Sequence, residues 1–137
     1  MFKSIMIPVD ISHVDTLRRA LDVGSDLGKH YGAGVTVVGV TTAAPAASAH
    51  SPEELEQKLE ALAKDLSGAH GIEARAKTVV SHDPTIDMED KLVDAAKDLG
   101  ADLVVMASHK PGLLEHIISA HAVDFAAHTD MSVFIVR

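Results

Sequence analysis

Short apolar runs alternate along the chain with longer segments in which apolar residues recur every three or four positions. Runs of this length between turn residues are typical of strands buried on both faces, whereas the wider spacing marks one face of a helix. Five strands are therefore predicted, at residues 4–9, 35–40, 72–80, 101–106 and 132–136. Four helices are predicted between them, at residues 14–31, 51–69, 88–99 and 118–126.

The second predicted helix has the clearest boundary signal. Ser51 can serve as its N-cap, Pro52 stands at the first helical position, and Glu54 follows three residues after the cap. This combination is a capping box with the proline where no backbone donor is needed. Gly100 is expected to end the third helix, because glycine readily adopts the left-handed conformation found there.

The alternation of strands and helices predicts an α/β fold with a five-stranded parallel open sheet, right-handed crossovers and helices on both faces. Ligands of such sheets bind beyond the carboxyl ends of the strands, where the strand order reverses. The common orders 2-1-3-4-5 and 3-2-1-4-5 both place the first strand beside that reversal. In the order 3-2-1-4-5, Val9 and Asp10 would face residues 107–110 across one cleft. The length of 137 residues suits a single domain spanning residues 1–137.

Composition narrows the class of protein and its partners. Hydrophobic residues make up 47% and charged residues 23% of the chain, which is typical of a globular protein. The net charge of -8 repels nucleic acid and anionic membranes, so neither is expected as a partner. The lack of cysteine excludes disulfides and thiolate chemistry. Without a signal-peptide core or a long apolar segment, the chain is expected to be cytoplasmic.

Asp10, at the end of the first predicted strand, is the first candidate binding residue. Its carboxylate can accept hydrogen bonds from a ribose or an adenine, but an aspartate that caps the next turn is equally ordinary. Ser12 is predicted to be the N-cap of the first helix. Residues 81–83 read Ser-His-Asp, yet neighbouring residues cannot converge as a catalytic relay, so a turn is predicted there.

Nine histidines raise the question of a metal site. His121 and His128 share a face of the fourth predicted helix, with Asp124 between them. A metal ion needs three or four converging ligands, and the sequence has neither a compact histidine cluster nor an HExxH motif. No structural metal is therefore predicted, and these histidines are expected to be solvated. Only His109, in the loop after the fourth strand, is expected in the cleft.

Three segments of the chain resemble the universal stress protein family. They are the opening strand 5–10 followed by Ser12, the segment 102–109, and the terminal segment 132–137. The order of predicted elements also matches that family along nearly the whole chain. The resemblance implies a Rossmann-like sheet in the order 3-2-1-4-5, of the adenine nucleotide alpha hydrolase-like fold.

Nucleotide-binding members of that family carry a loop of the form Gly-x2-Gly-x9-Gly-(Ser/Thr), whose backbone N–H groups surround the phosphates. Here Ala107 and Lys110 stand at the first two glycine positions, and the third falls on Ser119-Ala120 or Ala120-His121. Residues 107–111 resemble a subgroup with Ala-Ser-His-Arg-Pro, in which the basic side chain lies near phosphate, a part that Lys110 would take. The resemblance implies that ATP or another adenine nucleotide is bound by Val9, Asp10, Val40, Ala107, His109, Lys110, Ser119, Ala120 and His121.

The resemblance also implies a homodimer, formed by pairing of the terminal strand 132–136 across a two-fold axis. The expected function is that of a non-catalytic, dimeric stress-response module that acts through an unknown protein partner. One alternative is a nucleotide-free interaction protein whose site has degenerated. A second is a slow ATP hydrolase, which would need a metal-bridging carboxylate and a water-positioning group that the sequence does not reveal.

Overall fold

The computed structural model describes residues 1–42, 51–108 and 123–137 of the chain, apart from the side chains of residues 84 and 85. The strands are β1 (Ser4–Pro8), β2 (Gly34–Thr42), β3 (Ala74–Ser81), β4 (Leu103–Ala107) and β5 (Ser132–Val136). The helices are α1 (Val14–Tyr31), α2 (Pro52–His70), α3 (Pro84–Asp98) and the short 3-10 helix η1 (Ile11–His13). Residues 123–127 are also helical.

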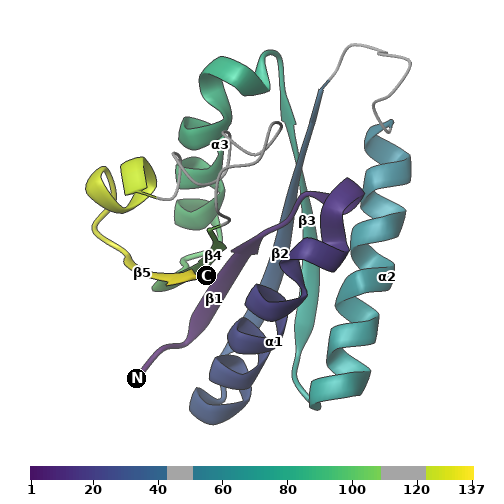
Figure 1. Ribbon diagram of the computed structural model, residues 1–137, viewed down its shortest axis with the longest axis vertical. Coiled ribbons are helices and arrows are strands. Elements are labelled where there is room, and N and C mark those ends of the chain that lie inside the picture. Colours follow the sequence, from purple (N-terminus) through teal and green to yellow (C-terminus); the bar gives the residue numbers. More distant parts are fainter. Residues whose placement is uncertain (43–50, 109–122) are drawn as a thin grey trace.

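The strands form one parallel sheet in the order β3-β2-β1-β4-β5, which confirms the predicted topology. Alternate residues of the central strand β1 face opposite layers. Ile5 and Ile7 pack with α1 and α2, while Met6 packs with α3 and with Phe125 from the helical segment 123–127. Figure 1 shows α1 and α2 on one side of the sheet and α3 on the other. The central strands are therefore buried on both faces.

Local signals set most helix boundaries as predicted. The Ser51 hydroxyl accepts a hydrogen bond from the Glu54 N–H at 3.2 Å, and Pro52 begins α2. Gly100, after α3, has a φ of 59°, so the expected left-handed glycine is confirmed. The start of α3 was predicted four residues too late. It begins at Pro84 because the Asp83 carbonyl accepts the N–H groups of Ile86 and Asp87, before the apolar periodicity becomes visible.

The strands differ from the prediction mainly in their ends. β2 extends to Thr42 rather than stopping at residue 40, because residues 41 and 42 still pair with Val80 and Ser81 of β3. β3 begins at Ala74 rather than at residue 72. Gly71 ends α2 in the left-handed conformation, and the chain uses the next residues to reverse its direction.

Glycines let the α1–α2 layer lie directly on the sheet. A Cβ atom added at Gly39 of β2 would lie 2.7 Å from Leu59 Cδ1 of α2. A Cβ atom added at Gly24 of α1 would lie 2.4 Å from Ile7 Cδ1 of β1. Both distances are shorter than carbon atoms tolerate, so larger residues at these positions would push a helix or a core side chain outward.

Asp102 fastens β1 to β4 at the amino ends of the strands. One carboxylate oxygen accepts the Lys3 N–H at 2.9 Å and the other accepts the Ser4 N–H at 3.1 Å. The backbone N–H of Asp102 donates in turn to the Ser4 carbonyl at 3.0 Å. These bonds satisfy the donors that precede β1 and fix where its pairing with β4 begins.

Candidate functional site

The strand order reverses between β1 and β4, so the candidate site lies at the carboxyl ends of these two strands. On one side, β1 pairs with β2 up to Pro8, and the Val9 N–H still donates to the Val38 carbonyl at 2.8 Å. On the other side, pairing with β4 runs only to Met6 and Val104. The chain that leaves β1 therefore stays with β2, and the β1–β4 ladder ends before the carboxyl ends of the two strands are reached.

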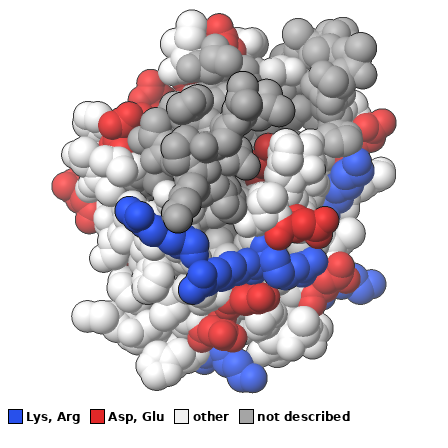
Figure 2. Space-filling view, viewed as in Figure 1, with Lys and Arg blue, Asp and Glu red and all other residues white. Residues whose placement is uncertain are grey.

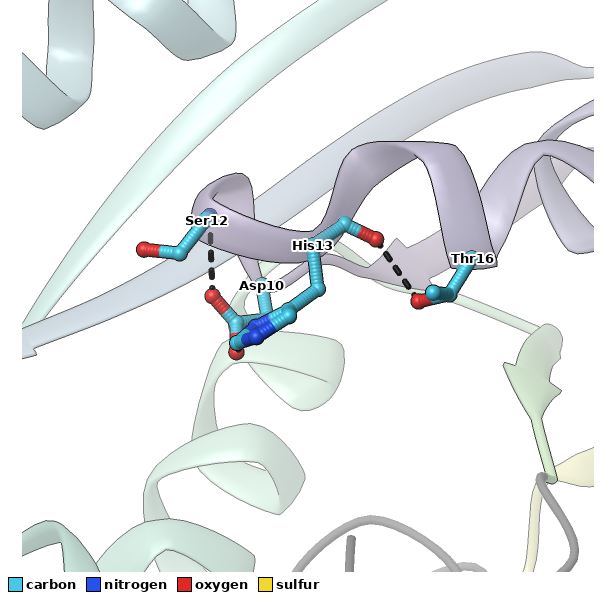
Figure 3. Close-up of polar contacts among 4 residues, drawn as sticks. All are labelled: Asp10, Ser12, His13 and Thr16. Atoms are coloured by element: carbon cyan, nitrogen blue, oxygen red, sulfur yellow. Dashed lines mark hydrogen bonds and ion pairs between the residues drawn. The ribbon is translucent and has the colours of Figure 1, made fainter. Parts of the chain in front are cut away.

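Asp10 is a charged residue just beyond the carboxyl end of β1. Its Oδ1 accepts the Ser12 N–H at 3.0 Å, and its Oδ2 lies 2.9 Å from Nδ1 of His13. Figure 3 shows the His13 ring against the carboxylate, with the Thr16 hydroxyl bound to the His13 carbonyl at 2.8 Å. The Asp10 side chain remains 44% exposed. The end of β1 thus presents a carboxylate that is held by two contacts and is open to solvent.

The prediction that Ser12 caps the first helix is wrong. A 3-10 turn, η1, separates β1 from α1, and Asp10 is its N-cap. His13 occupies the N-cap position of α1 and makes no side-chain capping bond there. Three residues are too few to show a helical periodicity, so the pattern of apolar residues did not predict η1. The Ser12 hydroxyl points away from Asp10 in Figure 3. Capping of the turn by Asp10 is confirmed. A contact between Asp10 and a nucleotide stays a prediction.

Three apolar residues of the predicted site lie near the carboxyl ends of β1, β2 and β4. Val9 and Ala107 are buried in the core beneath α1 and α2, so they can offer a ligand only their backbone atoms. Val40 is partly buried in the cluster on the α3 side of the sheet. The structure thus brings Val9 and Ala107 into one layer with Val40 on the other face, and the role of all three in binding stays a prediction.

The other predicted site residues are outside the described part of the chain. They are His109, Lys110, Ser119, Ala120 and His121. Ser108, just before them, donates its N–H to the carbonyl of Val136 at 2.7 Å. The chain is therefore still bound to the end of β5 where it leaves β4.

One histidine contact on the α3 side was missed by the sequence analysis. His128 Nδ1 lies 3.0 Å from Glu89 Oε1 of α3. This hydrogen bond, together with the negative charge of Glu89, raises the pKa of His128 above its usual value. The partners are far apart in sequence, so spacing could not reveal the pair. The Asp10–His13 contact was also missed, although its three-residue spacing is visible in the sequence.

The described part of the chain shows neither a cluster of metal ligands nor a membrane-spanning helix. Within residues 1–42, 51–108 and 123–137, no three His, Asp or Glu side chains are grouped as metal ligands would be. Among the helices that the structure describes, none is both long and apolar enough to cross a membrane. Figure 2 shows Lys and Arg side chains lying beside Asp and Glu on the face in view, so the charges there are mixed.

Comparison with known proteins identifies the family. The model of the universal stress protein family matches residues 1–137. Universal stress protein G from Shigella flexneri is 26% identical over 148 residues, covering 100% of both chains.

Solved structures show the same fold. A universal stress protein from Archaeoglobus fulgidus superposes with a TM-score of 0.75 at 18% identity over 100% of both chains. A universal stress protein in complex with cAMP has a TM-score of 0.73 at 19% identity, covering 99% of this chain and 97% of the other. The Archaeoglobus fulgidus protein in complex with dAMP has a TM-score of 0.70 at 18% identity over 98% of both chains. The five-stranded order and its helix layers are those of the adenine nucleotide alpha hydrolase-like fold, and the chain belongs to the universal stress protein family.

Proposed function

We propose that this protein binds an adenine nucleotide, ATP being the expected form, at the carboxyl ends of β1 and β4, and acts as a non-catalytic stress-response module. The observation that carries the proposal is Asp10, an accessible carboxylate held at the strand-order reversal. The fold supports it, because solved relatives with the same fold hold cAMP or dAMP.

The charge of Asp10 determines the orientation in which the nucleotide would bind. A carboxylate accepts hydrogen bonds from hydroxyl and amino groups and repels phosphate. The ribose or adenine therefore belongs beside Asp10 and the phosphates belong beyond β4. Lys110 supplies a cation in that part of the sequence, where the family's loop glycines are replaced. Val9, Val40, Ala107, His109, Ser119, Ala120 and His121 complete the proposed set.

We further propose a homodimer in which β5 pairs with its copy in a second chain. β5 lies at the edge of the sheet, and its apolar residues Phe134 and Ile135 are 46% and 37% exposed. Pairing two such edges would cover both the backbone groups and this apolar surface. Light scattering of Phe134→Glu tests the pairing, with a monomer expected and an unchanged dimer counting against it.

We also propose that residues 1–137 form one domain. The protein is proposed to be cytoplasmic and to act on a protein partner.

Absorbance and calorimetry test nucleotide binding directly. The chain has no Trp and one Tyr, so a co-purified adenine would dominate its ultraviolet spectrum. Added AMP or ATP with magnesium should raise the Tm by several degrees, since ligand at a hundred times Kd stabilises the folded state by about 2.7 kcal/mol. A protein-only spectrum with no change in Tm would instead favour a degenerate site. Release of phosphate from ATP would favour the hydrolase alternative.

A further inference from the structure

We infer that His13 is a positioning residue for this site, which holds the Asp10 carboxylate in the orientation that receives the hydroxyl or amino groups of a nucleoside. The inference rests on the proposed function and adds to it a residue outside the predicted set. His13 would therefore increase the affinity for the ribose and adenine of the ligand and would not act on its phosphates.

The geometry divides the two oxygens of Asp10 between two donors. Oδ1 accepts the Ser12 N–H at 3.0 Å, and Oδ2 faces His13 Nδ1 at 2.9 Å. A carboxylate oxygen has two lone pairs, so each oxygen retains one for a ligand. If the His13 contact were lost, the Ser12 bond would be the one restraint on rotation of the carboxylate left among the residues that the structure describes. His13 therefore reduces the conformational entropy that the Asp10 side chain would otherwise lose when a ligand binds.

The position of His13 is itself fixed by the backbone. Its N–H donates to the Asp10 carbonyl at 3.0 Å, and its carbonyl accepts the Thr16 hydroxyl at 2.8 Å. η1 also contacts both α1 and α2, so the turn is supported from two helices. The imidazole consequently reaches Asp10 from a restrained main chain, which is the arrangement that a positioning residue needs.

Exposure distinguishes this role from simple capping. The side chains of His13 and Asp10 are 62% and 44% exposed, and a polar contact between side chains with that much solvent access contributes little to folding. A contact that matters little for stability but orients an accessible acceptor should affect ligand binding instead. The two roles therefore predict opposite results for stability and affinity.

A double-mutant cycle measured by calorimetry with AMP tests the inference. His13→Ala and Asp10→Asn are each expected to weaken binding about tenfold, since hydrogen bonds to charged groups are of that order. The double variant should be no weaker than Asp10→Asn alone, because His13 acts through Asp10. His13→Asn, whose amide nitrogen stands near the place of Nδ1, should retain wild-type affinity within about threefold.

Two further variants act as controls. His13→Gln keeps the size of the side chain but places its amide too far out to replace Nδ1, so it should behave like His13→Ala. His30→Ala removes an exposed histidine at the far end of α1 and should leave AMP affinity unchanged. The Tm of every variant is measured, and the Asn and Gln variants carry the comparison if His13→Ala proves unstable.

The outcomes separate this inference from the proposed function. If the wild-type protein binds neither AMP nor ATP with magnesium, both the proposed function and the role of His13 are overturned. If the wild type binds and His13→Ala or His13→Gln binds equally well, only the role of His13 is overturned. A loss that is fully additive with Asp10→Asn would also overturn it, because His13 would then act by another route.

Discussion

Asp102 and Asp10 lie at opposite ends of the sheet, and their carboxylates have different structural roles. Asp102, at the amino ends, accepts the N–H groups of Lys3 and Ser4, which lie 99 and 98 residues before it in the sequence. Among the described residues, the Asp10 carboxylate at the carboxyl ends forms hydrogen bonds with Ser12 and His13, which follow it by two and three residues. Long-range bonds join strands, whereas local bonds only shape a turn. Of these two carboxylates, the one at the amino ends holds two strands together, and the one at the carboxyl ends holds a turn and remains 44% exposed.

The strongest test of this difference is Asp102→Ala. It leaves one partly buried and one exposed backbone donor without their charged acceptor, and we expect a loss of about 2 kcal/mol in the free energy of unfolding. Urea denaturation measures the loss, with Asp90→Ala on the exposed side of α3 as the control. An unfolding midpoint equal to that of the control would remove the distinction between the two ends.

Ser51→Ala tests the carboxyl side of the sheet, where α2 begins. The Ser51 hydroxyl caps α2 through the Glu54 N–H, so its removal should cost about 1 kcal/mol. Because this cap is local, the loss should be smaller than that of Asp102→Ala in the same urea series. A loss equal to that of Asp102→Ala would mean that local caps matter as much here as bonds between strands.

Asp10→Ala should have a smaller effect on folding still, of about 0.5 kcal/mol, because it caps only a three-residue turn and is exposed. Its main effect is expected on AMP affinity, while Asp102→Ala should leave that affinity unchanged. Calorimetry at a temperature where both variants are folded makes the comparison. A larger unfolding loss for Asp10→Ala than for Asp102→Ala would reverse the roles of the two ends.

The smallest expected effect concerns the His128–Glu89 pair, which joins α3 to the segment after residues 123–127. Glu89 raises the pKa of His128 in the folded protein. The stabilisation from this pair is therefore fully present below the unfolded pKa of histidine, about 6.5, and is lost as pH rises through the folded pKa of His128. His128→Gln should therefore lower the urea midpoint at pH 5.5 and leave it nearly unchanged at pH 8.5. A His30→Gln variant controls for loss of a histidine, and a pH-independent difference would contradict the assignment.

Local patterns predicted most of the fold, because the signals that begin and end helices lie within a few residues. Ser51, Pro52 and Gly100 act on their own neighbours, so their roles were readable. The start of α3 was misplaced because the Asp83 carbonyl fixes it before any apolar side chain does. The strand order could be predicted from the family resemblance and the alternation of elements.

The candidate site was less predictable, since it depends on contacts that the pattern does not encode. The contacts of Asp102, at the opposite end of the sheet, could not be predicted for the same reason, because no local spacing connects Asp102 with Lys3 and Ser4. η1 is too short for a periodic signal, so Ser12 was wrongly predicted to cap α1, whereas the predicted capping of the next turn by Asp10 is confirmed. The contribution of residues 109–121 to the site remains a prediction made from their sequence.

The central place of β1 has a consequence for the order in which the chain folds. During synthesis, β1 can pair with β2 as soon as that strand emerges, and β2 can then pair with β3. The other edge of β1 must wait for β4 and for Asp102, which arrive much later. A half-made chain therefore carries an open apolar edge, and its closure is a late, non-local event of the kind that slows folding and favours capture by chaperones.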